Sequence, residues 1–171
     1  MWKYIVYTLL VLVVVLAVYY FYPSHKLAPG TVIDKLVVNK SKRVMQAYNG
    51  NTLVKTYKIA LGKNPVGHKQ FEGDGKTPEG TYTINERNPN SGYHKNLGIS
   101  YPNAEDIAYA RRLGKLPGGL IKIHGLRNGR GYIGKFHRWK NWTAGCIAVT
   151  DEEIDELYKT VIPNAVIQIE P

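Results

Sequence analysis

Cysteine is nearly absent from the sequence, since Cys146 is the only one among 171 residues. A single thiol excludes an internal disulfide framework and any zinc module built from several cysteines. The histidines do not indicate a metal site either. An i, i+4 pair on a helix is the usual histidine signature of such a site, and His25, His68, His94 and His137 form no such pair. We therefore expect no metal ion and no other cofactor.

Acidic residues are missing from one quarter of the chain. No Asp or Glu occurs from Ile107 to Thr150, whereas the whole chain has 13 acidic and 23 basic residues and a net charge of +10. The segment contains nine cations: Arg111, Arg112, Lys115, Lys122, Arg127, Arg130, Lys135, Arg138 and Lys140. A concentrated positive potential attracts anions into a cleft. Tyr132, Trp139 and Trp142 could stack on bases, but no nucleic-acid motif is present, so we expect a partner that carries carboxylates and is not a nucleic acid.

Charge is also absent from the N-terminal run Tyr4–Tyr22. At about 1.5 Å per residue, a helix of this length spans roughly 28 Å, close to the hydrocarbon thickness of a bilayer. Tyrosines stand at both ends, where a membrane interface favours aromatic rings, and no small-x-small cleavage site follows. We expect residues 1–22 to form one transmembrane anchor inserted through residues 4–22, residues 23–31 a spacer, and residues 32–171 the folded part.

The folded part has a mainly β pattern. Apolar and β-branched residues predict strands over residues 34–39, 44–48, 53–61, 81–84, 120–123 and 166–169. Residues 74–80 read as a loop dense in turn residues. Residues 85–118 are expected to be irregular apart from a helix at 104–113. Thr150 and Glu153 make a capping box that begins a second helix, whose apolar stripe includes Ile154 and Leu157.

The sequence around Cys146 favours a reactive thiol over an inert buried one. Gly145 permits a sharp turn beside the sulfur, and Thr143 supplies a hydroxyl. A thiolate forms near neutral pH only with a base or a positive field. His124, at the end of a predicted strand, can supply the base, and the nine cations can supply the field. The histidine precedes the cysteine by 22 positions, which argues against papain-like enzymes, in which the cysteine comes first.

Three motifs together resemble the L,D-transpeptidase catalytic domain family, of the YkuD type. They are Asp74-Gly-Lys-Thr-Pro-Glu-Gly-Thr-Tyr82, Ile123-His-Gly125 and Thr143-Ala-Gly-Cys-Ile147, and the resemblance covers roughly residues 32–170. It implies a β-sandwich with one or two helices, held on the periplasmic side of the cytoplasmic membrane. The implied reaction is attack of the cysteine on a peptidoglycan stem peptide, loss of the terminal D-alanine, and transfer of the acyl group from the thioester to an amine.

The resemblance also implies roles for individual residues. Cys146 is the expected nucleophile and His124 the general base. The Gly145 and Cys146 backbone N–H groups are the expected oxyanion donors, while Thr143 and Gly125 belong to the loops that hold the pair.

The motif departs from the family pattern at two positions. Ala144 stands where the family usually has histidine, and Ala148 where it usually has Arg or Asn. Arg130 and Arg138 are candidates to bind a substrate carboxylate in their place, because guanidinium suits bidentate contact. We expect Tyr132 and Trp142 to contribute to the same substrate site.

Two alternatives stay open. The same acyl-enzyme could be hydrolysed, as by a peptidoglycan amidase or an L,D-carboxypeptidase. A non-catalytic, basic wall-binding module would explain the anchor and the charge but not the His-Gly and Gly-Cys motifs. The reactivity of Cys146 separates the enzymes from the module, because a binding module has no need of a reactive thiol.

Overall fold

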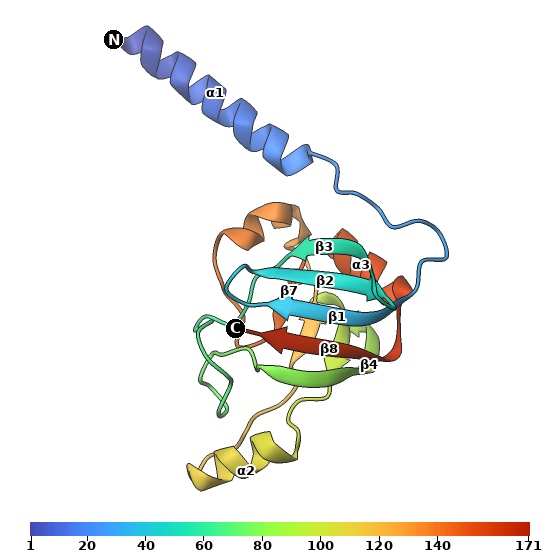
Figure 1. Cartoon of the computed structure of the whole chain (residues 1–171). Helices are drawn as coiled ribbons and strands as arrows, with labels where there is room; N and C mark the ends of the chain where they lie inside the picture. The colour runs from blue at the N-terminus through green and yellow to red at the C-terminus, as the bar shows by residue number, and fades with distance from the viewer.

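A curled eight-stranded sheet forms the centre of the protein in the computed structural model, which describes residues 1–171 (Figure 1). The strand order is β3-β2-β1-β8-β4-β5-β6-β7. The strands are β1 (Ile33–Asn39), β2 (Val44–Asn49), β3 (Thr52–Lys58), β4 (Gly80–Ser91), β5 (His94–Ile99), β6 (Lys122–His124), β7 (Ile147–Ala148) and β8 (Val161–Glu170). The helices are α1 (Trp2–Phe21), α2 (Ala104–Arg112), α3 (Asp151–Thr160) and the 3-10 segment η1 (Gly131–Trp139).

The mainly β prediction is confirmed, but one curled sheet takes the place of the expected two-sheet sandwich. The reason lies in β4, which pairs with β8 through Gly80–Thr83 and with β5 through the stretch that follows. This one strand therefore continues the hydrogen-bonded ladder from the first half of the sheet into the second half. Its register shifts between Ile84 and Glu86, as at a β-bulge, and bulges bend a strand.

Residues 85–99 differ from the sequence-based expectation of irregular chain. They form the β4–β5 hairpin, whose turn lies between Ser91 and His94. The prediction failed because residues 85–92 are polar apart from Pro89 and Gly92, so the period of a half-buried strand is hidden in β4. The expected helix beyond it is present as α2, and the Asn103 and Asp106 side chains close a capping box at its start.

The buried core packs the curled sheet against α3. Thr150 and Glu153 form the predicted capping box of this helix, and Ile154 and Leu157 are fully buried. Ile123 of β6 and Ile147 of β7 belong to the same core. Core packing thus fixes β6, which ends at His124, and β7, which follows Cys146. A catalytic pair requires such rigid supports.

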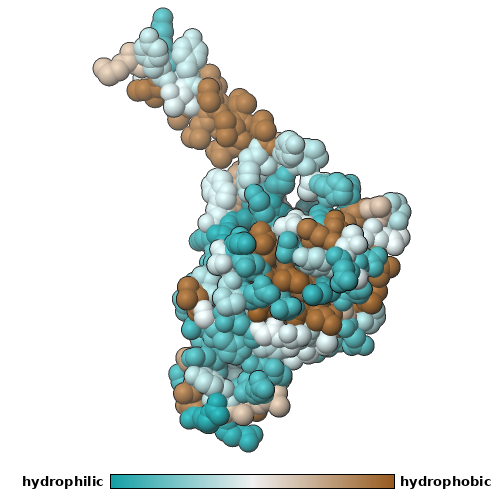
Figure 2. Space-filling model, viewed as in Figure 1, coloured by the Kyte–Doolittle hydropathy of each residue, from teal (hydrophilic) through white to brown (hydrophobic).

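Helix α1 projects from the domain and has no buried residue (Figure 1). Its length and apolar composition suit a membrane span or a signal sequence. Figure 2 shows hydrophobic side chains over the middle of the helix. At its C-terminal end the Tyr19 and Tyr20 rings lie 5.7 and 5.4 Å from the ring of Phe136 in η1, so the helix ends against this segment.

Candidate active site

Cys146 and His124 come together because β6 and β7 run side by side in parallel. Ile123 pairs with Ile147 and His124 with Ala148, so the residue before β7 lies next to the strand that ends in the histidine. Both side chains line one cleft of about 560 Å³. Two residues 22 positions apart in sequence therefore share one site through strand register.

Thr143 shapes the turn that carries the sulfur. Its hydroxyl donates to the Cys146 carbonyl oxygen at 2.7 Å and accepts from the Gly145 N–H at 3.1 Å. The hydroxyl thus bridges both sides of the turn. Because the Gly145 N–H already donates to Thr143, it is not free to donate to a second group in this arrangement.

The Cys146 loop packs directly on the backbone of the loop at residues 74–80. Gly145 has a φ of +142°, and a Cβ there would lie 2.6 Å from the carbonyl oxygen of Lys76. A Cβ on Gly62 would lie 2.2 Å from the carbonyl oxygen of Gly75. The Gly62 N–H donates to Thr77 Oγ1 at 3.0 Å. The turn-rich motif therefore supports the Cys146 loop through contacts that only glycine allows.

Asp74 holds that supporting loop in shape. Its carboxylate accepts from the backbone N–H groups of Gln70, Phe71 and Lys76 at 2.7, 3.2 and 3.0 Å, and from Lys69 Nζ at 2.9 Å. Burial raises the pKa of Asp74, but these donors outweigh burial and bring the pKa below its ordinary value. The side chain is therefore charged at neutral pH, and its role is to order the loop.

The protonation of the His124 ring follows from its partner. Nδ1 lies 2.7 Å from the Gly125 carbonyl oxygen, and because a carbonyl only accepts, Nδ1 must hold the proton. The side chain is buried, and burial lowers the pKa of His124 below its ordinary value. The ring is therefore neutral at pH 7 with Nε2 unprotonated, which is the form a general base needs.

Gly125 must lack a side chain for the histidine strand to fit. A Cβ there would lie 2.6 Å from Asp151 Oδ1, and the same oxygen accepts from the Leu126 N–H at 2.7 Å. Asp151 begins α3, so the His-Gly motif also connects β6 to this helix.

The pKa of the Cys146 thiol shifts in the direction opposite to the one expected from the sequence, in which a field of cations favours the thiolate. Burial raises the pKa of Cys146 above its ordinary value, although the Lys122 N–H and the charges of Lys122 and Lys69 oppose the rise. Only Lys122 among the nine cations of the 107–150 segment is among these causes. The Sγ atom lies 3.6 Å from the Leu120 carbonyl oxygen, to which it can donate. Sulfur and imidazole are thus both neutral at rest.

Aromatic rings enclose the histidine on the cleft side. The ring centroids of Tyr93 and His124 are 4.7 Å apart, those of His124 and Trp142 5.7 Å, and those of Tyr93 and Trp142 6.2 Å. Tyr93 comes from the β4–β5 hairpin turn, which the sequence did not predict. The same hairpin supplies most of the polar lining, which consists of Asn88, Asn90, Ser91 and Asn96 together with Lys63 and Lys122.

The predicted substrate-binding residues separate into two groups. Trp142 lines the cleft, and Arg130 lines a neighbouring pocket that Trp142 shares. Arg138 instead donates to the buried Glu153 at 2.6 Å, and Tyr132 is exposed on η1. Neither side chain lines the cleft, so the structure gives no support to their predicted contact with substrate.

The two positions that depart from the family motif have different surroundings. Ala144 lines the cleft, so the absent histidine leaves more room beside the sulfur. Ala148 is fully buried in β7 and exchanges backbone hydrogen bonds with Ala60. A long polar side chain has no place there.

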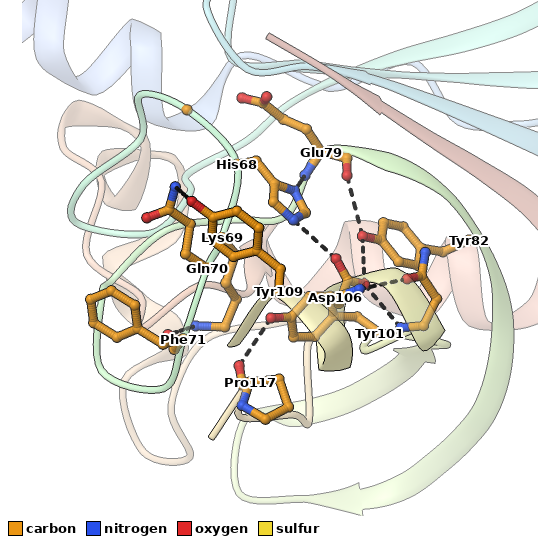
Figure 3. Close-up of polar contacts among 12 residues, drawn as sticks. His68, Lys69, Gln70, Phe71, Glu79, Tyr82, Tyr101, Asp106, Tyr109 and Pro117 are labelled. Carbon is orange, nitrogen blue, oxygen red and sulfur yellow. Dashed lines mark hydrogen bonds and ion pairs between the residues drawn. The ribbon is translucent and has the colours of Figure 1, made fainter. Parts of the chain in front are cut away.

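A second polar cluster lies away from the cleft, where α2 meets the 68–80 loop (Figure 3). His68 Nε2 lies 2.9 Å from Asp106 Oδ1, while its Nδ1 accepts from the Glu79 N–H at 2.9 Å. Tyr82 donates to Asp106 Oδ2 at 3.1 Å. Every one of these groups has a partner, so the cluster fixes α2 to the loop. No group of three His, Cys, Asp or Glu side chains able to hold a metal ion occurs in the chain.

Comparison with known proteins points to one family. The family model described as "YkuD: L,D-transpeptidase catalytic domain" matches residues 33–169. "Putative L,D-transpeptidase YafK" of Escherichia coli is 33% identical over 111 residues, covering 64% of this chain and 37% of that protein. "Putative L,D-transpeptidase YkuD" of Bacillus licheniformis is 30% identical over 136 residues, covering 80% of this chain and 64% of that protein. The chain thus spans less than two thirds of either relative.

Two solved structures share the fold. The helical cell shape determining protein Pgp2 of Campylobacter jejuni has a TM-score of 0.61 and 26% identity, covering 82% of this chain and 48% of that chain. An L,D-transpeptidase from Mycobacterium smegmatis has a TM-score of 0.54 and 13% identity, covering 80% of this chain and 58% of that chain. At that identity the second likeness shows the fold alone.

Proposed function

The chain belongs to the L,D-transpeptidase catalytic domain family, and from this premise we propose that it is a cysteine acyltransferase acting on peptidoglycan stem peptides. The observation that carries the proposal is the pairing of a cysteine with a histidine whose Nε2 is unprotonated, in one cleft. A binding module has no need of this pair. The acyl donor in this proposal is a tetrapeptide stem, and its terminal D-alanine is the leaving group.

The first step is attack of Cys146 on the amide carbonyl that joins D-alanine to the stem. The thiol proton passes to His124 Nε2 while a C–S bond forms and the carbonyl oxygen becomes an oxyanion. The C–N bond then breaks, and the imidazolium returns the proton to the D-alanine amine. Since both groups start neutral, the proton transfer creates charge only when substrate is in place.

Backbone N–H groups beside the sulfur stabilise the oxyanion in this mechanism. The Gly145 N–H donates to Thr143 Oγ1, so we assign the oxyanion first to the Cys146 N–H. The Gly145 N–H contributes only if it turns away from Thr143 during attack. Trp142 and Tyr93 shield His124 from water on the cleft side, which strengthens these electrostatic interactions.

The thioester then transfers the acyl group to an amine of a second stem peptide, which gives a crosslink. Attack by water on the same thioester gives a tripeptide or releases a protein from its stem. The products distinguish these reactions, because transfer yields a peptide dimer and hydrolysis does not.

We also propose that α1 holds the domain on the extracytoplasmic side of the cytoplasmic membrane. The helix has no buried residue and a hydropathy suited to a span. Stem peptides lie outside the cytoplasm, so the substrate requires the same side. The fold that Pgp2 shares with the chain makes cell-wall remodelling and cell shape the process we propose.

The test measures D-alanine release from a tetrapeptide stem by the full-length protein in detergent micelles. Cys146→Ala should abolish release, and His124→Ala should slow it by about two to four orders of magnitude, the usual contribution of a general base. His25→Ala, which removes an exposed histidine in the spacer, is the matched control and should keep the full rate. Release that persists in Cys146→Ala would overturn the proposal.

A further inference from the structure

A second pocket of about 470 Å³ lies beside the catalytic cleft, and we call it the η1 pocket. Tyr93 and Trp142 line both cavities and so form the wall between them. The remaining lining residues are Leu126, Arg127, Arg130, Ile133, Phe136, His137 and Lys140. Each of the two volumes lies in the range that holds one small ligand. The site therefore has room for two ligands separated by two aromatic rings.

The η1 pocket contains buried polar atoms that the fold leaves unsatisfied. His137 is only 6% exposed, and neither of its ring nitrogens has a hydrogen-bond partner. The Trp142 Nε1–H lacks an acceptor as well. A buried polar group without a partner destabilises the folded chain, because it has lost its hydrogen bonds to water. Three of the six buried side-chain atoms without a partner belong to these two residues of the η1 pocket, and the others belong to Arg43, Asn96 and Arg138. Unpartnered atoms at a pocket wall are expected where a ligand supplies the missing partners.

The charges at the pocket are of one sign. Arg127, Arg130 and Lys140 line it, none of the three takes part in an ion pair, and no acidic residue lines the pocket. Arg138, by contrast, is occupied by Glu153. Free guanidinium groups favour carboxylates through paired, charge-assisted hydrogen bonds.

The histidine narrows the ligand class further. Burial lowers the pKa of His137 to about 3, so its ring is neutral and offers one N–H donor and one bare acceptor nitrogen. A fully ionised phosphate or a polymer of phosphates accepts hydrogen bonds but has none to donate, and it leaves the bare nitrogen unsatisfied. A peptide or amino acid has both a carboxylate and N–H groups.

We propose that the η1 pocket binds a carboxylate-bearing peptide and that this peptide is the amine acceptor of the acyl transfer. The inference rests on the proposed function and adds to it the site of the second substrate. Hydrolysis needs only water, whereas transfer needs a second peptide held next to the thioester. A pocket across one aromatic wall from Cys146 therefore favours transfer over hydrolysis.

Equilibrium binding tests the pocket without turnover. The probe is the tripeptide L-alanyl-γ-D-glutamyl-meso-diaminopimelate, which has no terminal D-alanine and can serve only as acceptor. Binding is measured by calorimetry on full-length Cys146→Ala in detergent micelles. Adding Arg130→Gln and Lys140→Gln should raise Kd at least tenfold, because charge-assisted bonds are lost. The matched control, Arg111→Gln with Lys42→Gln, removes the same charge from exposed positions away from both cavities and should leave Kd unchanged.

His137→Phe separates binding from folding. Phenylalanine keeps a ring of similar shape and removes both unpartnered nitrogens, so the free energy of unfolding should stay the same or rise while Kd rises. In ¹⁵N spectra of the histidine side chains, the His137 nitrogens should shift when the tripeptide is added. The inference would be overturned if the Arg130→Gln, Lys140→Gln variant bound the tripeptide as tightly as its control. It would also be overturned if the His137 resonances did not move.

A second readout distinguishes this failure from failure of the proposed function. With Cys146 restored, the ratio of peptide dimer to released D-alanine should fall in the Arg130→Gln, Lys140→Gln pair and not in the control. If D-alanine is released but this ratio is the same in both, only the η1 pocket is wrongly assigned. If the unaltered chain releases no D-alanine, the proposed function fails first.

Discussion

The glycine at position 62 gives the sharpest prediction about how the site is held. Gly62 lies where the segment after β3 passes between the 74–80 loop and the Cys146 loop. We predict that Gly62→Ala damages both stability and catalysis, although alanine is a small residue and Gly62 does not have a positive φ. The effect is therefore steric and local, and does not come from backbone strain at position 62 itself.

The size of the effect follows from the distances. The added methyl would lie 2.2 Å from the Gly75 carbonyl oxygen and 3.2 Å from Gly145 Cα, whereas ordinary contact begins near 3.5 Å. One of the two loops must move by about 1 Å. Overpacking of this kind costs about 1–3 kcal/mol, which corresponds to a Tm lower by about 2–12 °C in a protein of this size. A 1 Å displacement of a catalytic group can slow a reaction about a hundredfold.

Calorimetry and D-alanine release measure the two effects on the full-length protein. Gly119→Ala is the matched control, because it is the same substitution, also without a positive φ, and its Cβ meets only Pro102 Cδ at 4.0 Å. The control should keep both its Tm and its rate. If Gly62→Ala behaves like Gly119→Ala, the two loops are not in backbone contact and the account of how Cys146 is supported is wrong.

Three further predictions concern protonation, the buried ion pair and the membrane. Burial lowers the pKa of His124 and raises that of Cys146, so acylation should hold its rate as pH falls through 6.5 and decline only below it. For the same reason iodoacetamide at pH 8 should alkylate Cys146 more slowly than free cysteine, so that acylation by a stem peptide, and not reactivity toward a general alkylating reagent, separates an enzyme from a binding module; faster alkylation than free cysteine would refute a neutral pair. Arg138→Met should lower the free energy of unfolding by about 3–5 kcal/mol, because it strands the buried Glu153, and should leave KM for the stem peptide unchanged; a raised KM with normal stability would return Arg138 to the substrate site. The full chain should sediment with membranes and be cut by protease added to spheroplasts, and protection until lysis would contradict the orientation.

Local signals in the sequence were sufficient for part of the fold. The capping box at Thr150 and Glu153 and the stripe of Ile154 and Leu157 specify α3 within a few residues. The first three strands were equally readable, because β-branched alternation and an Asn-Gly turn are short-range features. Such elements depend on neighbours in sequence, so sequence patterns report them.

The site itself depends on contacts between distant residues, and these were less accessible. The motifs identify Cys146 and His124 as candidate site residues. The parallel register of β6 and β7 that brings them to one cleft pairs residues far apart in sequence, so no local pattern predicts it. Sequence alone leaves Tyr93 equally compatible with a place over the cleft and with ordinary packing, because the β4–β5 hairpin that carries it is not predicted from its mostly polar residues. The charge pattern could not show that Glu153 neutralises Arg138, or that burial reverses the expected direction of the pKa shift at Cys146. Burial and pairing are properties of the folded chain alone.

The most direct test of the central claim is the intact mass of the full-length protein after brief reaction with a tetrapeptide stem and an acid quench. The account predicts one adduct with the mass of the stem minus D-alanine, located on Cys146 by peptide mapping and absent from Cys146→Ala. A carbapenem should give a single adduct at the same residue. An unmodified mass with both reagents, or an adduct that maps to any other residue, would contradict the assignment of Cys146 as the acyl-forming nucleophile.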